Sequence, residues 1–299
     1  PIPISTPGFD PAPYITAPFC VTKDPENKSR NVGTYRLMVK DKIKTGFNVQ
    51  SPSQHGAIHW KKCKDKGRSM ELAVVMGASP SVGMVSVAKI PITVDEFSVA
   101  GGIAKEPLEL VKCETTDMEV PATSEIVLEG EVTTNYFEPE GPFGEWAGYV
   151  GTRRMNPCFN IKCITHRKNP VYQAFISQMP PTESSLIRGI SHEAEIYGAL
   201  KYHCNVPGVL DVALHESGSS WFYCVIKLRK LYPHQPWQAL HAAVSIEPYI
   251  GKITIVVDDD IDARDPNSVN WALSFRMQPD SDMEVVKGKV ALYSDPSSI

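Results

Sequence analysis

Two glutamates flank a turn that glycine and proline constrain, in the segment PEGPFGEWAGYVG at residues 139–151. Glu140 and Glu145 are separated by Gly-Pro-Phe-Gly, which limits the backbone conformations available to the turn. Two solvated acids on a surface turn are the ordinary explanation of such a pair. A rigid turn, however, can aim both carboxyl groups at one point, where one acid stays protonated and the other is ionised. Such a pair would suit proton transfer, and its ionised member would need a cation.

Arg36 is the candidate for that cation. It lies in the strand that we predict over Tyr35–Val39, within the stretch of residues 34–50. Alternation along this strand places Arg36 on the face opposite to Tyr35 and Leu37. If both faces are covered, Arg36 is a half-buried cation that requires an acidic partner. On an edge strand it would lie in water, and the residues alone leave both possibilities open.

A second set of residues has the atoms of a metal site. Asn31, His55 and Glu96 each begin or flank an expected element, and their oxygen and nitrogen ligands suit Mn(II) or Mg(II) bridged to a phosphate. Each also has an ordinary structural explanation. Asn31 could be a turn residue, His55 could lie in a first helical turn, and Glu96 follows Thr93 at the spacing of a capping box. Metal binding therefore stays open on residue types alone.

The composition is that of a globular protein with a substantial core. The chain has 299 residues, 42% hydrophobic and 21% charged, with a net charge of −4. The charge argues against nucleic acid or an anionic membrane as the main partner, and no apolar run approaches the roughly 20 residues that span a bilayer. Seven scattered cysteines without a CxxC pair indicate free packing thiols in a reducing compartment, so we expect a cytoplasmic protein.

The first half of the chain is rich in strand-forming residues. Two helices interrupt it, beginning near Ser53 and Thr93. Many strands with few helices indicate a barrel or sandwich core. The predicted strands lie within residues 14–24, 34–50, 70–80, 108–115, 124–133 and 159–167.

After Pro180-Pro181 the pattern changes to alternating helices and strands. Residues 182–203 have helical spacing with Thr182 as N-cap, and a second helix is expected over residues 236–246. This alternation indicates an α/β domain. The boundary is expected between residues 170 and 181. Because the chain begins without Met and ends soon after a strand-like stretch, we expect a piece of a longer protein. The predicted strands lie within residues 209–216, 221–230 and 252–262.

Taken together in their order, several motifs closely resemble the UbiD family of reversible decarboxylases. The motifs are NVGTYR, SPSQH, KIPITVDEFSVAGG, LELVKCETTDMEVPATSEIVLEG and PEGPFGEWAGYVG. The resemblance runs from about Thr6 to beyond Asp262, and the stretch from VPATSEIVLEG to EGPFGE is its most specific part. It implies an α+β protein in which a split β-barrel like that of flavin reductases, at residues 1–175, holds prenylated FMN. An incomplete α/β domain follows at residues 181–299.

The resemblance also assigns roles to residues. Asn31, His55 and Glu96 match manganese ligands, which favours the ligand role of Glu96 over the capping box. In the stretch SVAK, main-chain oxygens and the Ser86 side chain match a potassium site. Arg36, Glu140 and Glu145 match a Glu-Arg-Glu catalytic network. The implied cofactor contacts are Asn31, Tyr35, Arg36, Gln54, His55, Ser86, Ala88, Lys89 and Glu96.

The implied reaction is reversible, non-oxidative decarboxylation of an aromatic or α,β-unsaturated carboxylic acid through a covalent prenylated-FMN adduct, with CO2 as co-product. Arg36 would hold Glu140 and help to place the substrate carboxylate, and Glu145 would donate the proton after CO2 leaves. Phe143 and Trp146 would help to build an apolar pocket. A flavin prenyltransferase would supply the cofactor, and a homo-oligomer, dimer or hexamer, is expected. The alternatives are a non-catalytic subunit of a larger carboxylase complex and a split-barrel flavin oxidoreductase.

Two further features receive no role in the reaction. Lys252 matches a cofactor-facing lysine of some family members only loosely. The acidic run Asp258–Asp262 has the residue types of a metal cluster, but we expect a structural role for it because it ends a strand that reads as buried.

Overall fold

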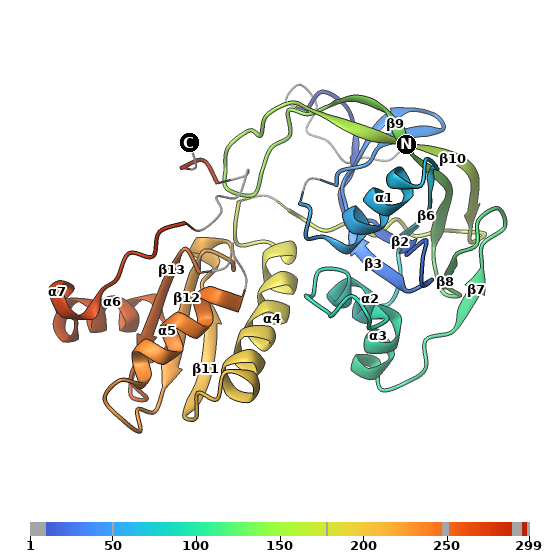
Figure 1. The fold of residues 1–299 in the computed structure, drawn as a ribbon. Helices are drawn as coiled ribbons and strands as arrows, with labels where there is room; N and C mark the ends of the chain where they lie inside the picture. The colour runs from blue at the N-terminus through green and yellow to red at the C-terminus, as the bar shows by residue number, and fades with distance from the viewer. Residues whose placement is uncertain (1–9, 50, 178, 247–250, 289–294, 298–299) are drawn as a thin grey trace. The chain divides into compact units, whose positions relative to one another are not determined.

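The computed structural model describes residues 10–49, 51–177, 179–246, 251–288 and 295–297 (Figure 1). Contacts between Cα atoms divide the chain into two compact units. The first unit comprises residues 1–144 and 150–176, and the second comprises residues 145–149 and 177–299. The turn of residues 145–149 thus belongs to the second unit, although the residues directly before and after it in the chain belong to the first.

The first unit is built on an eight-stranded antiparallel sheet that curls into a half-barrel (Figure 1). The strand order is β1-β4-β5-β10-β9-β6-β2-β3, so β1 and β3 are the two edges. This arrangement, followed by a separate α/β unit, confirms the predicted fold class. The strands are β1 (Tyr14–Ile15), β2 (Phe19–Lys23), β3 (Arg30–Thr34), β4 (Leu37–Asp41), β5 (Lys44–Gly46), β6 (Met70–Met76), β9 (Ile126–Glu140) and β10 (Arg154–His166).

Three helices and a small ribbon cover this sheet. They are α1 (His55–Asp65), α2 (Pro80–Val85), α3 (Glu96–Ala104) and the two-stranded pair β7 (Leu110–Lys112) and β8 (Glu119–Pro121). Strand β6 shows why both faces are buried. Leu72 and Val74 pack with α1 and Phe159 in one core, whereas Ala73 and Val75 pack with α2 and α3 in another. Such burial on both faces accounts for the continuous apolar run MELAVVM.

The second unit is a three-stranded sheet between helices. Its strand order is β11-β12-β13, with β11 and β12 antiparallel and β12 and β13 parallel. Helices α4 and α5 pack against Ile226 on one face, and α6 packs against Val225 on the other. The elements are β11 (Val209–Leu214), β12 (Tyr223–Leu228), β13 (Ile253–Val257), α4 (Glu183–Gly198), η1 (Ala199–His203), η2 (Glu216–Gly218), α5 (Gln235–Ile246), α6 (Pro266–Arg276) and α7 (Pro279–Asp282).

Several local predictions are confirmed, and some elements were missed. Thr182 caps α4, because its side chain accepts a hydrogen bond from the Ser185 amide at 3.3 Å. Helices α2, α6 and α7 and strands β3 and β8 were not predicted, although Asp265 followed by Pro266 is a recognisable helix start. In the described part of the chain, the helices are too short or too polar for a bilayer crossing.

Arg36 lies outside any strand, which corrects the prediction of one strand over Tyr35–Val39. Strand β3 ends at Thr34 and β4 begins at Leu37, so Tyr35 and Arg36 form the corner between them. The cause is that β3 pairs with β2 whereas β4 pairs with β1 and β5, which forces the chain to change direction here. Because Arg36 lies at this corner, its side chain does not follow the alternation of a strand. The side chain can therefore reach Glu140, the last residue of β9.

Candidate active site

A buried ion pair joins the corner at Arg36 to the end of β9. The Arg36 Nε lies 2.9 Å from Oε1 of Glu140, whose side chain is 1% exposed. The half-buried alternative for Arg36 is therefore the correct one, since its own side chain is 13% exposed. A charged pair this deeply buried requires good geometry and further hydrogen bonds to offset its desolvation.

Two asparagines supply those hydrogen bonds. Asn156 on β10 donates to Oε2 of Glu140 at 2.6 Å, and the Asn48 side chain donates to Oε1 at 3.4 Å. The Asn48 amide also donates to the Arg36 carbonyl at 3.3 Å, which ties the corner to the same cluster. Both asparagines are buried, and the sequence analysis did not identify either of them. Both Glu140 carboxylate oxygens thus accept hydrogen bonds, which hold this side chain in place beside Arg36.

Aromatic rings cover the other side of Arg36. The guanidinium carbon lies 4.3 Å from the centre of the Phe143 ring, and that ring packs edge-on against Tyr14 at 4.7 Å. Burial, together with the Glu140 carboxylate, raises the pKa of Tyr14 to about 12. Phe143 was expected to build the pocket of Glu145, and in the structure it packs on Arg36. The arginine is thus held between a carboxylate and an aromatic face.

Tyr35 fixes the neighbouring part of the site by filling the space between two glycines. A Cβ atom at Gly33 would lie 2.6 Å from the Tyr35 ring, and one at Gly56 would lie 2.8 Å from it. The Tyr35 hydroxyl also accepts a hydrogen bond from the Gly56 amide at 3.0 Å. The ring therefore holds the first turn of α1, which begins at His55, against β3.

We expect Gly56→Ala to lower the free energy of unfolding by about 1–3 kcal/mol, because the buried Tyr35 ring cannot move away from Gly33. Gly102→Ala in α3 is the matched control. No atom lies within 4 Å of a Cβ there, so alanine should raise stability by up to about 1 kcal/mol. Urea unfolding of the two variants measures the difference, and equal effects would contradict the packing role of Tyr35.

Glu96 is the first residue of α3 and is not part of a capping box. The helix is capped by Asp95, whose side chain accepts from the Phe97 amide at 3.0 Å. Glu96 is buried, and its Oε2 accepts from the Val32 amide at 3.1 Å while its Oε1 lies 3.5 Å from Nδ1 of His55. The interpretation of Glu96 as a cap partner of Thr93 is thus wrong. Its carboxylate is directed to β3 and α1.

Asn31 lies on β3, directly before Val32 in the chain. Its Nδ2 donates to Oγ1 of Thr22 at 3.1 Å, so Oδ1 is the atom of Asn31 that would take a metal. The same Thr22 hydroxyl lies 3.0 Å from Nδ1 of His59. Asn31, His55 and Glu96 therefore come from three different elements, β3, α1 and α3, and the contacts above bring these elements together.

The buried His59 makes the free energy of unfolding depend on pH. Burial lowers the pKa of His59 from 6.5 to about 4, against the opposing influence of the Asp24 carboxylate. Between these values the unfolded chain binds the proton and the folded chain does not, so stability falls as the pH drops. From pH 7 to 5 we expect a loss of about 2 kcal/mol that His59→Gln removes. Urea unfolding at the two pH values measures it. The same pH dependence in both proteins would refute the assignment.

Further groups fit a phosphate-bearing cofactor held through a cation. The buried Oε1 of Gln54 has no hydrogen-bond partner among the described residues, at the residue that precedes α1. The Ser86 hydroxyl lies 2.9 Å from that of Thr34, and the Ser86 carbonyl accepts from the Thr34 amide at 3.0 Å. The stretch from Ser86 to Lys89 therefore begins against the end of β3, next to Tyr35. A phosphate held through a cation requires oxygen and nitrogen atoms that can bind the cation. The unpartnered Oε1 of Gln54 is one such atom.

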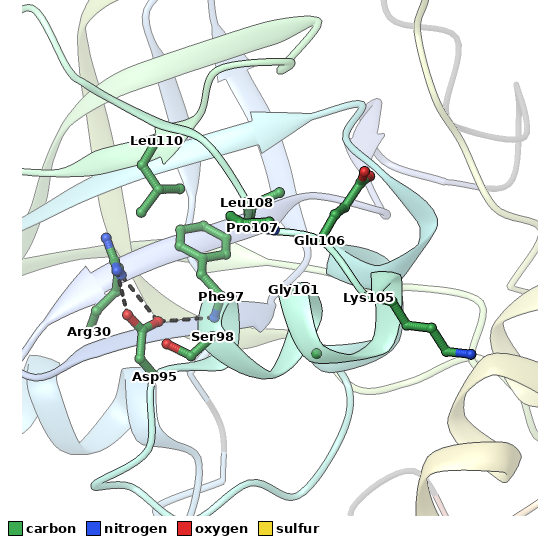
Figure 2. A pocket seen from close by; sticks show the side chains of 11 residues that line it. Arg30, Asp95, Phe97, Ser98, Gly101, Lys105, Glu106, Pro107, Leu108 and Leu110 are labelled. Atoms are coloured by element: carbon green, nitrogen blue, oxygen red, sulfur yellow. Dashed lines mark hydrogen bonds and ion pairs between the residues drawn. The ribbon is translucent and has the colours of Figure 1, made fainter.

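The structure also shows a hollow at α3 and the partners of Lys252 and of the acidic run Asp258–Asp262. A shallow hollow of about 490 Å³ lies at α3, where Arg30 pairs with Asp95 (Figure 2). None of the predicted site residues lines it, so it is separate from the ion pair and the ligand set. Lys252 pairs with Asp295 at 2.7 Å. The acidic run Asp258–Asp262 supplies ion pairs to Arg229 and Arg276, and the described residues hold no group of three acidic, histidine or cysteine side chains able to bind a metal.

Glu145 begins a tight turn of the second unit. Its amide donates to the Tyr149 carbonyl at 2.8 Å, its carbonyl accepts from the Gly148 amide at 3.0 Å, and the residue is 6% exposed. Gly148 has a φ of 83°, which favours glycine. The following Trp146 packs against Phe222 at 5.2 Å and Trp221 at 5.9 Å between ring centres. The pairing of Glu145 with Arg36 and Glu140 stays a prediction.

Comparison with known proteins identifies the family of this fold. A family model for the 3-octaprenyl-4-hydroxybenzoate carboxy-lyase Rift-related domain matches residues 1–180, and the model for the C-terminal domain of the same enzymes matches residues 185–299. The chain belongs to the UbiD family. The family resemblance seen in the motifs is thereby confirmed over nearly the whole chain.

Solved UbiD-class structures share the fold. HmfF of Pelotomaculum thermopropionicum, solved with FMN, is 36% identical with a TM-score of 0.91 over 99% of this chain and 65% of that one. An evolved dimeric form of HmfF was solved with prenylated FMN and has a TM-score of 0.89. Vanillic acid decarboxylase of Sedimentibacter hydroxybenzoicus is 29% identical, with a TM-score of 0.88 over 97% of this chain and 61% of its own.

A curated UbiD relative has an assigned activity. Anhydromevalonate phosphate decarboxylase of Methanothermobacter thermautotrophicus is 32% identical over 97% of this chain and 67% of its own length. Three other curated relatives are uncharacterised, and this chain spans 55–57% of their lengths.

Proposed function

We propose that this chain is a prenylated-FMN-dependent carboxy-lyase that reversibly decarboxylates an aromatic or α,β-unsaturated acid. The observation that carries the proposal is the buried pair of Arg36 and Glu140, clamped by Asn48 and Asn156, in a fold of the UbiD family. A flavin oxidoreductase would not require this pair. Support for the substrate class comes from relatives named for vanillic acid and for anhydromevalonate phosphate.

The first unit would hold the cofactor. In this proposal Asn31, His55 and Glu96 would hold Mn2+ and the stretch from Ser86 to Lys89 would hold K+, and these cations would supply positive charge for the flavin phosphate. The contact between His55 and Glu96 and the unpartnered Oε1 of Gln54 support this arrangement. Prenylated FMN would supply the electron sink that carbon–carbon cleavage of an sp²-bound carboxylate requires.

The protein would position the acid and move one proton. The bond between the substrate carbon and its carboxylate breaks, CO2 leaves, and the electron pair stays with the carbon. Arg36, held by Glu140, would orient the departing carboxylate by its positive charge. Glu145 would then give its proton to the carbon, forming the new C–H bond, and in the carboxylation direction it would accept that proton.

An isotope-exchange assay tests this function. The purified chain, produced with a flavin prenyltransferase, is incubated with labelled CO2 and a panel of aromatic and unsaturated acids. We expect the label to enter the carboxyl group of at least one acid, because exchange reports the reversible step even when net turnover is unfavourable. Absence of exchange with every acid, although the cofactor is bound, would overturn the proposal and favour a non-catalytic subunit.

A further inference from the structure

Thr22 links Asn31, one of the proposed cation ligands, to a buried histidine. Thr22 on β2 and Asn31 on β3 are directly opposite each other in the sheet, so their side chains lie on the same face. Helix α1 contacts both strands and carries His55 and His59 one turn apart. The Thr22 hydroxyl lies 3.1 Å from Nδ2 of Asn31 and 3.0 Å from Nδ1 of His59. One hydroxyl therefore joins β2, β3 and α1.

The hydrogen bonds of this hydroxyl have a direction. A threonine hydroxyl has a single hydrogen to donate, and its oxygen can accept from other groups. Because it accepts from the amide nitrogen of Asn31, its own hydrogen is available for Nδ1 of His59. Burial lowers the pKa of His59 to about 4, so the ring is neutral at pH 7 and Nδ1 can accept. Donation thus runs from Asn31 to Thr22 and from Thr22 to His59.

This order of donation decides which amide atom of Asn31 is left for a cation. The amide has an oxygen that can bind a cation and an NH₂ group that cannot. With Nδ2 held by Thr22, Oδ1 is the atom that is left. A Thr22 hydrogen directed at Asn31 would favour the reverse orientation of the amide, with Oδ1 held by Thr22. His59 opposes this reversal, because it takes the Thr22 hydrogen.

The burial of this chain of contacts argues against a purely structural role for it. Thr22 and His59 are fully buried, and Asn31 is 4% exposed. The Nε2 of His59 has no hydrogen-bond partner among the described residues. A buried ring nitrogen without a partner costs stability, and an apolar side chain at this position would avoid that cost. The contact of His59 with Thr22 therefore has a use other than stability.

We propose that Thr22 and His59 are positioning residues of the cation site in the first unit. Thr22 holds the Asn31 amide with Oδ1 directed to the cation, and His59 fixes the direction of the Thr22 hydroxyl. The inference rests on the proposed function, in which Asn31 is one of three Mn2+ ligands. Both residues would act through Asn31 and not by binding the cation themselves. Replacing such a partner of a ligand typically changes metal affinity by about tenfold to a hundredfold.

Affinity for Mn2+ tests the positioning role without turnover. The purified chain is titrated with Mn2+ in the presence of FMN, and the electron paramagnetic resonance signal of free Mn2+ gives the dissociation constant. Thr22→Val removes the hydroxyl and nearly keeps the shape, so we expect it to weaken Mn2+ binding by about tenfold to a hundredfold. Thr22→Ser keeps the hydroxyl and should retain most of the affinity.

Thr45→Val is the matched control. Thr45 on β5 is also buried in the first unit, but its hydroxyl has no hydrogen-bond partner among the described residues. The substitution makes the same chemical change at a buried threonine and should leave the Mn2+ affinity unchanged. Circular dichroism of each variant verifies that it is folded.

Two further comparisons separate the orientation of Asn31 from a general effect on the fold. Asn31→Asp presents an oxygen in either orientation, so adding Thr22→Val to it should cause little further loss of Mn2+ affinity. His59→Leu removes the acceptor and should weaken Mn2+ binding, whereas His59→Asn keeps an amide oxygen that can accept from Thr22 and should retain part of the affinity. If Thr22→Val does not fold, the two His59 variants decide.

Other results would overturn the positioning role. They are an unchanged affinity in Thr22→Val or His59→Leu, an equal loss in Thr45→Val, or an undiminished loss from Thr22→Val in the Asn31→Asp protein. Failure of the unsubstituted chain to bind Mn2+ would refute the ligand set and this role with it. The isotope-exchange assay separates these failures from that of the proposed function. Exchange with an unchanged affinity in Thr22→Val refutes the positioning role alone, whereas the expected losses of affinity without exchange refute the decarboxylase alone.

Discussion

Glu145→Gln is expected to lower the rate of net decarboxylation by about 10²–10⁴-fold, the usual contribution of a positioned general acid. Glutamine has nearly the shape of glutamate, so the tight turn from Glu145 to Tyr149, which main-chain hydrogen bonds hold, should persist. What is lost is the proton for the substrate carbon. Glu284→Gln is the control, since Glu284 pairs with His241 on the surface of the same unit, and it should keep full activity.

The same variant separates proton transfer from bond cleavage. Exchange of labelled CO2 into the substrate requires the carbon–carbon bond to break and re-form, but it requires no proton. We therefore expect Glu145→Gln to retain exchange while it loses formation of the protonated product. Equal losses of exchange and product would show that Glu145 acts in binding or cleavage, and unchanged product formation would exclude it as the proton donor.

Glu140→Gln is expected to lower the free energy of unfolding by about 3–5 kcal/mol, because it removes the negative charge from a buried ion pair. Glutamine also presents an N–H₂ group to Asn48 or Asn156, where both asparagines donate to carboxylate oxygens. Turnover should fall as well, since Arg36 would no longer be held. Urea unfolding followed by circular dichroism measures the stability, and the decarboxylation assay measures the rate.

Glu138→Gln is the matched control for this second prediction. Glu138 lies on the same strand and pairs with Lys44 at 2.6 Å, but both side chains are more exposed, at 18% and 27%. A pair of this kind contributes about 0–1 kcal/mol. If the two substitutions destabilise the protein equally, the Arg36–Glu140 pair is not the buried anchor that we describe.

The local sequence was sufficient to predict most elements as helix or strand and to pair Glu140 with Arg36. Glycine and proline marked the turn after Glu140, and the need of a buried acid for a cation led to Arg36. The error at Arg36 came from treating Tyr35–Val39 as one strand, because the alternation of side chains does not reveal that β3 and β4 pair with different neighbours. The strands with which β3 and β4 pair are determined by the whole sheet and not by the residues around Arg36.

The partners that complete the site are distant in sequence. Asn156 meets Glu140 through the pairing of β10 with β9, and that register includes shifts that no local pattern specifies. Glu96 fitted a capping box by spacing, yet its carboxylate contacts the Val32 amide and His55. Asp95, a preferred N-cap residue directly before Glu96, was the local signal that this interpretation overlooked.

Native mass spectrometry decides whether this chain is built around a prenylated flavin. The chain is purified from a host that contains a flavin prenyltransferase, and the mass of the bound cofactor is measured. The account predicts a flavin heavier than FMN by one prenyl addition, lost together with the metal when Glu96 is replaced by alanine. A chain that carries only ordinary FMN under these conditions would contradict it.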